Sequence, residues 1–290
     1  MHPLILFLHV HVIICGYLQT IYILRGRVIH LIELIITDLD KTLLNDKKEL
    51  SSYTEEVLLE CRRKKGIKVA FATARPERAT KGFQQLIQPD YVISNNGATI
   101  SCNGNTIYNN IIPTDVCNML ISNLVKMRDV IWLTAEAGAC LYTNYKGEPW
   151  DTENWNPVYN DFSEQLNEDI SKISIECKKP ELINTLISEF PNLHLYTNSG
   201  EDWCQVMHVK STKMNAALYL SEVLKISCRN FVAFGDDYND IELIKKSGTG
   251  VAVGNAIESV KQVADFISLS NNNDGVAKWL EENILGLHGA

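Results

Sequence analysis

Two carboxylates separated by one residue follow an apolar run near the start of the chain. Residues 34–37 are apolar except for one threonine, and Asp38 and Asp40 come next. Such a run is typical of a buried strand, and ligands of open α/β sheets bind where the strands end. Two carboxylates held together repel each other and resist the loss of water. The pattern therefore suits a bound cation, although a strand end followed by a capped turn would also place Asp there.

A second acidic group follows another apolar run late in the chain. Residues 231–234 are apolar, Gly235 allows a tight turn, and an acidic turn occupies residues 236–240. If the two apolar runs lie side by side in a parallel sheet, both acidic groups face one crevice. Carboxylates in oxygen-rich turns suit a hard cation such as Mg²⁺, which also takes waters and a phosphate oxygen.

Thr73 and Lys213 could hold a phosphate group beside such a cation. Thr73 follows the strand expected at 67–72, which is apolar except for Lys68, and Pro76 opens the next helix. A hydroxyl and free backbone N–H groups would therefore meet where an anion can bind. Thr73 could instead be an ordinary helix N-cap. Lys213 opens a later helix and suits phosphate oxygens. One carboxylate could then attack phosphorus, while its neighbour protonates the leaving oxygen and later activates water.

The elements that must position these residues alternate between strand and helix. Residues 51–66 predict a helix with acidic residues first, basic residues last and Gly66 at its end. The strand expected at 67–72 then completes a βαβ unit, so the sequence predicts an α/β fold with a parallel sheet. The other expected elements are strands at 91–94, 204–209 and 231–234, short strands within 248–256 and 265–269, and helices at 211–224 and 276–283.

The pattern changes between residues 99 and 198. Helical stretches near residues 115–127 and 180–190 alternate with short strands, and each half of the region runs helix, strand and polar turn. This order predicts an α+β insert rather than more parallel sheet. Trp150, Trp155 and the later Trp203 could contact a ligand, although local packing would also explain each. The strands expected in the insert lie at 132–134, 140–143, 173–176 and 193–196.

Composition places the chain among ordinary globular proteins. Its 290 residues can form one large domain or two modest ones. A net charge of −8 without a block of Lys and Arg gives no footprint for a nucleic-acid backbone, so no nucleic-acid partner is expected. The eight cysteines are scattered along the chain and favour reduced thiols in the cytoplasm.

The amino-terminal segment is the exception. Residues 4–24 are nearly all apolar and long enough to cross a bilayer as a helix, although two histidines and Gln19 weaken that interpretation. A removable signal peptide is disfavoured, because the segment has no basic start and no small-residue cleavage site. If the segment inserts, Arg25 and Arg27 would keep the rest of the chain in the cytoplasm. Residues 1–31 are therefore either a membrane anchor or an appendage.

Four motifs in this order resemble those of the haloacid dehalogenase (HAD) superfamily of phosphohydrolases, and more narrowly its Cof-type, subfamily IIB, sugar-phosphatase-like members. Residues 38–44 (DLDKTLL) are similar to the first motif, residues 72–75 (ATAR) to the second, Lys213 to the third and residues 235–240 (GDDYND) to the fourth. Residues 96–98 and 273–276 are similar to further Cof-type signatures. The resemblance covers about residues 33–284. It implies a Rossmann-like core with an inserted α+β cap of the C2B type.

The resemblance implies a role for each matching residue. Asp38 would be the nucleophile and Asp40 the general acid and base. The proposed ligands of Mg²⁺ are Asp38, the main-chain carbonyl of Asp40, Asp236 and, in support, Asp240. The phosphate group would be held by Thr73, Ala74, Lys213 and Asn239, and the substrate-side candidates are Arg75, Asn96, Gly97 and Asp274.

Domains and an activity follow from the same resemblance. The core would take residues 32–105 and 199–290, and a mobile cap at residues 106–198 would close over the site and select the substrate. The expected enzyme is a Mg²⁺-dependent phosphatase that hydrolyses a small phosphorylated metabolite, such as a sugar phosphate or a phosphorylated cofactor, through an aspartyl-phosphate. The alternatives are a phosphomutase of the same superfamily and a phosphate-binding module without turnover, which would have no need for Asp40.

Two residues depart from the family pattern. Lys41 and Ala74 each stand where glycine is most common in the resembling motifs. Lys41 is expected to point to solvent, although it could add a phosphate contact or alter the turn. Neither change removes a functional group.

Overall fold

The computed structural model describes residues 8–14, 17–24, 27–147, 155–197 and 203–286. The chain divides into two compact units. Residues 1–71 and 217–290 form the first unit, and residues 72–216 form the second. Both ends of the chain therefore build the first unit, and the middle of the chain builds the second. The domain boundaries expected at residues 105 and 199 stay a prediction.

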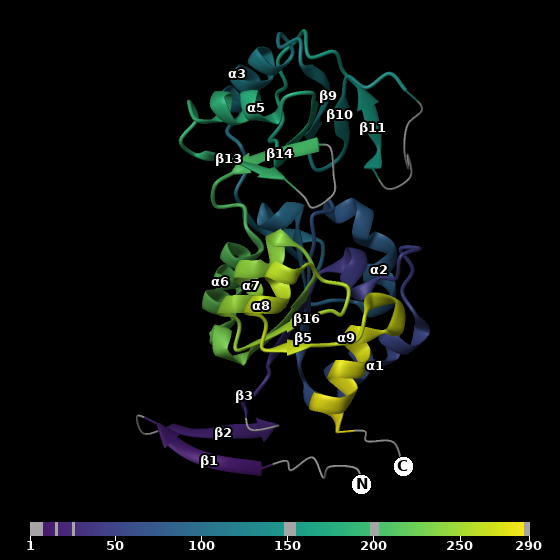
Figure 1. Cartoon of the computed structure of the whole chain (residues 1–290), viewed down its shortest axis with the longest axis vertical. Helices are drawn as coiled ribbons and strands as arrows, with labels where there is room; N and C mark the ends of the chain where they lie inside the picture. The colour runs from purple at the N-terminus through teal and green to yellow at the C-terminus, as the bar shows by residue number, and fades with distance from the viewer. Residues whose placement is uncertain (1–7, 15–16, 25–26, 148–154, 198–202, 287–290) are drawn as a thin grey trace. The chain divides into compact units, whose positions relative to one another are not determined.

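A parallel sheet lies at the centre of the first unit (Figure 1). Within this unit the strands follow the order β17-β16-β15-β4-β5. All four residues of β4 (Leu34–Thr37) are buried, as a parallel strand covered on both faces requires. β4 pairs in parallel with β15 (Phe231–Gly235) and with β5 (Lys68–Ala72). The predicted α/β core is confirmed, and the remaining strands are β16 (Thr249–Ala252) and β17 (Phe266–Ile267).

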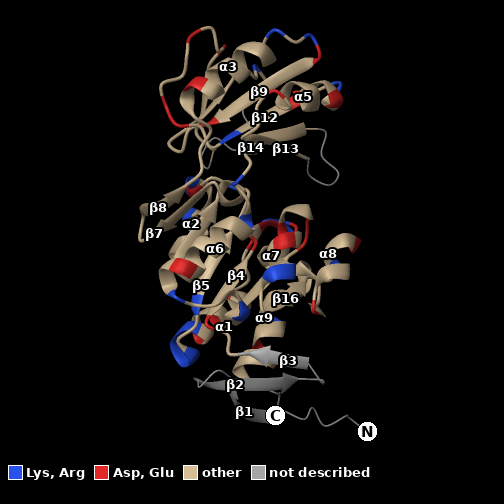
Figure 2. Ribbon diagram, turned by 90° about the vertical axis from the view of Figure 1, so that its left-hand side faces the viewer, with Lys and Arg blue, Asp and Glu red and all other residues tan. Residues whose placement is uncertain are grey.

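Helices form at the expected positions 51–66, 211–224 and 276–283, whereas α7 (Ile241–Lys246) and α8 (Glu258–Val263) were not predicted. The Ser51 hydroxyl accepts a 3.0 Å hydrogen bond from Thr54 N at the start of α1 (Ser52–Lys65). Gly66 ends that helix with a φ of +67°, which glycine adopts without strain. Figure 2 shows the basic last turn of α1 in blue, where positive charge offsets the helix dipole. The other helices are α9 (Gly275–Leu280) and α6 (Lys213–Leu224), which enters the first unit from the second.

The second unit contains two antiparallel strand pairings near its start. β6 (Tyr91–Ser94) pairs with β7 (Thr99–Cys102), and β7 pairs with β8 (Asn105–Asn109). Asn103 and Gly104 connect β7 to β8 with φ values of +51° and +75°, as the tightest hairpin turns require. A 3₁₀ turn (Glu77–Thr80) and α2 (Lys81–Ile87) precede these strands.

A six-stranded sheet with two helices makes up most of the second unit. Apolar side chains of α3 (Thr114–Leu124) and α5 (Pro180–Ile187) share one buried cluster with the sheet. Leu120 and Ile183 are fully buried there. The insert is therefore α+β, as predicted. Its strand order is β11 (Pro157–Tyr159), β10 (Leu141–Thr143), β9 (Val130–Glu136), β12 (Lys172–Cys177), β14 (Trp203–His208) and β13 (Leu193–Thr197).

One strand lies in a different sheet from the one its sequence position suggested. The sequence predicts that the strand at 204–209 returns the chain to the core. It is β14, which pairs in antiparallel fashion with β12 and β13 inside the six-stranded sheet. The alternating pattern of a strand does not reveal its partners, because pairing depends on residues distant in sequence.

The described amino-terminal residues form strands rather than a helix. β1 (Leu8–Ile14), β2 (Tyr17–Leu24) and β3 (Arg27–His30) form an antiparallel sheet in that order. The helix considered for residues 4–24 is wrong over β1 and β2, and the rest of that segment lies outside the described residues. Alternation of His with β-branched residues in β1 favours a strand. Within the described ranges, no helix combines the length and the apolar character needed to cross a bilayer.

Candidate active site

Asp38 stands at the end of the buried strand β4. Its backbone N–H donates a 3.1 Å hydrogen bond to the carbonyl of Phe234, which lies on the neighbouring strand β15. The Thr37 hydroxyl donates to the Asp38 carbonyl at 2.8 Å. Only 8% of the residue is exposed. The strand and its neighbour thus hold the Asp38 backbone in place and leave its carboxylate at the carboxyl edge of the sheet.

The turn after β15 fixes two further carboxylates. Asp240 Oδ2 accepts hydrogen bonds from the backbone N–H groups of Asp236 (3.0 Å) and Asp237 (3.3 Å). A Cβ atom on Gly235 would lie 2.4 Å from the Asp240 side chain, so only glycine lets the turn fold back this closely. The Thr42 hydroxyl donates to Asp236 Oδ1 at 2.8 Å. The first acidic motif therefore orients a carboxylate of the last one.

Three buried carboxylates come together in the first unit. One oxygen each from Asp38, Asp236 and Asp240 lies within 4.8 Å of the others. Carboxylates this close repel one another, and burial adds to the cost unless a positive charge offsets it. An oxygen-only donor set suits Mg²⁺. These side chains therefore fit the predicted metal ion.

Asp40 and Lys41 lie on an irregular turn after Asp38. Lys41 has a φ of +57°, in the left-handed region that favours glycine. This explains why glycine is common at the matching position of the resembling motif. The Lys41 carbonyl accepts a 2.7 Å hydrogen bond from Asn255 Nδ2. The Lys41 side chain is exposed, as expected. Asp40 is half-buried and is not one of the three clustered carboxylates.

The expected phosphate-binding loop begins in the second unit, two residues after Phe71, which pairs with Thr37 in the sheet. Thr73 is 1% exposed. Its hydroxyl accepts a 3.1 Å hydrogen bond from Arg75 N, and its carbonyl accepts one from Asn96 N at 2.9 Å. The N-cap alternative is not realised, because the following turn has Pro76 at its cap and no side-chain hydrogen bond there.

Asn96 and Gly97 pack against the start of α6. A Cβ atom on Gly97 would lie 2.2 Å from the Thr212 carbonyl oxygen, so glycine is required for the chains to approach. Lys213 follows directly and is 1% exposed, although it is charged. Asn96 donates to Gln205 Oε1 at 3.3 Å. The structure thus brings together the residues around Thr73, Asn96 and Lys213 within one unit.

Other predicted residues have contacts of a different kind. Arg75 Nη1 donates to the Ala79 carbonyl at 3.3 Å, and its guanidinium lies 5.4 Å from the Phe83 ring centroid. Asp274 accepts from the hydroxyls of Ser51 and Thr54, which tie it to the start of α1. Their substrate-side roles stay predictions. Asn239 is half-buried in the acidic turn, Trp155 and Trp203 are half-buried, and Trp150 lies outside the described residues.

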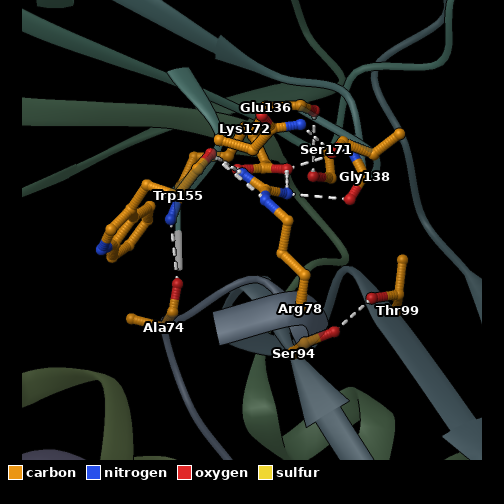
Figure 3. Close-up of polar contacts among 11 residues, drawn as sticks. Ala74, Arg78, Ser94, Thr99, Glu136, Gly138, Trp155, Ser171 and Lys172 are labelled. Atoms are coloured by element: carbon orange, nitrogen blue, oxygen red, sulfur yellow. Dashed lines mark hydrogen bonds and ion pairs between the residues drawn. The ribbon is translucent and has the colours of Figure 1, made fainter. Parts of the chain in front are cut away.

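A group of charged residues that was not predicted lies next to residues 73–78, here called the Thr73 loop (Figure 3). Lys172 donates a 2.9 Å hydrogen bond to the Ala74 carbonyl. Arg78 forms an ion pair with Glu136, whose side chain is fully buried. Glu136 and Lys172 lie just outside the strands expected at 132–134 and 173–176, at the ends of β9 and β12, so the strand pattern did not single them out.

Comparisons with known proteins identify the family of the chain. The family model of the haloacid dehalogenase-like hydrolases matches residues 35–280. A 5-amino-6-(5-phospho-D-ribitylamino)uracil phosphatase of Bacillus subtilis (strain 168) is 29% identical over 263 residues, which cover 86% of this chain and 96% of the relative. The pyridoxal phosphate phosphatase YbhA of Escherichia coli (strain K12) is 23% identical, over 87% of this chain and 98% of the relative.

Solved structures share the fold. A haloacid dehalogenase-like hydrolase from Bacteroides thetaiotaomicron superposes with a TM-score of 0.76 at 26% identity, covering 87% of this chain and 99% of that one. The subclass IIB sugar phosphatase BT4131 superposes with a TM-score of 0.73 at 21% identity, covering 88% and 100%. At 21% identity, the similarity to BT4131 shows a shared fold and nothing more.

Proposed function

The chain belongs to the haloacid dehalogenase-like hydrolases, and from this premise we propose that it is a Mg²⁺-dependent phosphatase acting on small phosphorylated metabolites. The observation that carries the proposal is the group of three buried carboxylates, Asp38, Asp236 and Asp240, at the ends of adjacent parallel strands. The relatives named above are phosphatases of phosphorylated small molecules, which supports the same class of substrate.

Asp38, Asp236 and the main-chain carbonyl of Asp40 are the proposed ligands of Mg²⁺, with Asp240 in support. The ion, when bound, would neutralise charge on the phosphate oxygens. Asp240 would act mainly by holding the Asp236 backbone, since its Oδ2 accepts from Asp236 N. Thr42 would keep one oxygen of Asp236 occupied and so direct the other toward the ion.

The proposed reaction has two steps at Asp38. A carboxylate oxygen of Asp38 attacks phosphorus as the bond from phosphorus to the leaving oxygen breaks. Asp40 gives its proton to that oxygen, so the alcohol departs neutral and an aspartyl-phosphate remains. Asp40 then takes a proton from water, whose oxygen attacks phosphorus, releases inorganic phosphate and restores the Asp38 carboxylate.

Residues of the Thr73 loop and Lys213 are proposed to hold the phosphate group. The hydroxyl of Thr73 is already placed by Arg75 N, so its own proton can be donated to a phosphate oxygen. Lys213 is buried and would offset the charge of the transferring group. Ala74 and Asn239 would contribute backbone and amide donors. The α+β insert would close over the substrate and choose the leaving group.

A panel of phosphorylated metabolites, assayed for free phosphate with Mg²⁺ and with EDTA, tests the proposal. The panel should include hexose phosphates, sugar-alcohol phosphates and pyridoxal 5′-phosphate. Metal-dependent release of phosphate from at least one member is expected, and Asp38→Asn should lower the rate by about a thousandfold or more. The proposal fails if no member is hydrolysed, or if the products show transfer of phosphate between hydroxyls under a bisphosphate activator instead.

A further inference from the structure

Two opposite charges lie across from each other in the six-stranded sheet. Glu136 ends β9 and Lys172 begins β12, and the two residues are partners in the antiparallel register. They are 0% and 3% exposed. Each side chain reaches the segment that follows Thr73 (Figure 3). A buried pair in a sheet therefore contacts the loop that is proposed to bind phosphate.

Glu136 forms an ion pair with Arg78, which lies five residues after Thr73. Nη1 and Nη2 of Arg78 donate to the two carboxylate oxygens of Glu136, the second at 2.8 Å. The same guanidinium donates to the carbonyls of Gly138 and Trp155, each at 2.8 Å. Bidentate pairing of this kind is geometrically strict. Arg78 thus fixes the far end of the loop to the sheet.

Lys172 binds the backbone at the near end of the same loop. Its Nζ donates a 2.9 Å hydrogen bond to the carbonyl of Ala74, which follows Thr73 directly. The ammonium also lies 5.9 Å from the ring centroid of Trp155, whose backbone Arg78 holds. A hydrogen bond from a charged donor at a buried site is stronger than one between neutral groups. The loop is therefore held to the sheet at both ends.

We propose that Lys172, supported by Glu136 and Arg78, is a positioning residue that keeps the Thr73 loop in the conformation that binds the phosphate group. The inference rests on the proposed function. A loop that is ordered before the ligand arrives binds it more tightly, because less conformational freedom is lost on binding. Lys172 therefore sets the affinity for phosphate itself. A residue that touches the leaving group would instead affect some substrates and not others.

The experiment measures the dissociation constant of inorganic phosphate, with Mg²⁺ present, for the full chain and three variants. Lys172→Met removes the charge at similar volume and should weaken binding about tenfold, within the range expected for a charge-assisted hydrogen bond. Lys172→Arg keeps a charged donor and should recover most of the affinity. Lys179→Met is the matched control, because Lys179 is an exposed lysine of the same unit, with 57% of its side chain exposed, and pairs only weakly with Asp129 at 3.6 Å. It should match the unaltered chain.

Steady-state kinetics give a second reading that a purely structural role would not produce. With phenyl phosphate and with the best substrate of the panel, Lys172→Met should raise KM by one common factor, while kcat falls less than KM rises. The melting temperature shows whether the variant is folded. If Lys172→Met does not fold, Lys172→Leu, which also lacks both the charge and the donor, takes its place in both measurements.

Two outcomes would overturn the inference. Unchanged phosphate affinity in a folded uncharged variant would mean that the Ala74 contact does not order the loop. A KM increase for only one of the two substrates would place Lys172 on the leaving group instead. Failure of the proposed function looks different, because the unaltered chain would then hydrolyse neither substrate.

Discussion

The hydroxyl of Thr42 donates a 2.8 Å hydrogen bond to Oδ1 of Asp236, across 194 positions of the sequence. Thr42 is 1% exposed, and Asp236 is 7% exposed. The bond joins the turn after β4 to the turn after β15, so the two acidic motifs form one arrangement. It also restrains the orientation of the Asp236 carboxylate, which belongs to the group of three buried carboxylates.

We therefore expect Thr42→Val to weaken Mg²⁺ binding about tenfold while the fold is kept. Loss of a partner that orients a metal-ligating carboxylate typically costs ten- to a hundredfold in affinity. Calorimetric titration with Mg²⁺ measures the effect directly. Thr185→Val is the control, because the Thr185 hydroxyl only bonds the Glu181 carbonyl of its own helix, at an exposed position. Equal Mg²⁺ affinity in Thr42→Val and the control would show that this hydroxyl does not orient Asp236.

Gly235→Ala should disrupt the acidic turn. The new methyl group would lie 2.4 Å from Asp240, whose position is tied to the backbone of Asp236. Overpacking of this kind costs about 1–3 kcal/mol of unfolding free energy, and we expect Mg²⁺ affinity to fall with it.

Gly82→Ala is the matched control for that substitution. Gly82 lies in α2 with open space around the added atom, so the change should raise the unfolding free energy by about 0.5–1 kcal/mol. Urea unfolding of both variants compares the effects. A Gly235→Ala protein as stable as Gly82→Ala would argue against the close packing of the turn.

Lys41→Gly should stabilise the chain despite the loss of a side chain. Lys41 holds a φ of +57°, which costs a residue with a Cβ atom about 1 kcal/mol relative to glycine. Glycine also raises the conformational entropy of the unfolded chain, which offsets part of this gain. We therefore expect a small net increase in the unfolding free energy, seen as a higher urea midpoint. Lys245→Gly, inside helix α7, should instead lose about 1 kcal/mol. A loss at both positions would show that Lys41 makes a stabilising contact that outweighs its backbone strain.

Alkaline pH should lower the stability of the chain through its buried cysteines. Burial raises the pKa of Cys61 to about 12 and of Cys204 to about 11, from a normal value of 9.0. Between about pH 9 and 11 the unfolded chain loses these protons while the folded chain keeps them, so the unfolding free energy falls as pH rises. Melting temperatures from pH 8 to 10.5 measure the trend.

Cys61→Ala combined with Cys204→Ala provides the control for the pH experiment. Both thiols are then absent from the folded and the unfolded chain, and the decline in melting temperature above pH 9 should be shallower. An unchanged slope in the double variant would assign the decline to other groups.

The parallel core and the carboxylate group were predictable because the information is local. Each strand of the core is a short, mainly apolar run, and the residues proposed to do chemistry follow it within a few positions, as Asp38 follows β4 and Thr73 follows β5. Turn chemistry is also local. The end of α1 at Gly66 was predicted from the glycine that follows the basic last turn.

The remaining features depend on contacts between distant parts of the sequence. The prediction that β14 belongs to the core was wrong, because the residue pattern of a strand does not indicate which strands it pairs with. The Asn103-Gly104 dipeptide is a local signal for a tight hairpin turn, and the hairpin between β7 and β8 is predictable from it. The proximity of Lys172 and Glu136 to the Thr73 loop could not be predicted, because it depends on the register that pairs β9 with β12.

Chemical trapping of the phosphorylated enzyme tests the central claim most directly. The chain is mixed with a ³²P-labelled substrate from the panel and Mg²⁺, quenched in acid within milliseconds and digested, and the labelled peptide is sequenced by mass spectrometry. The account predicts acid-stable, base-labile label on Asp38, and no label with Asp38→Asn. Label on any other residue, or phosphate release by Asp38→Asn at the rate of the unaltered chain, would contradict it.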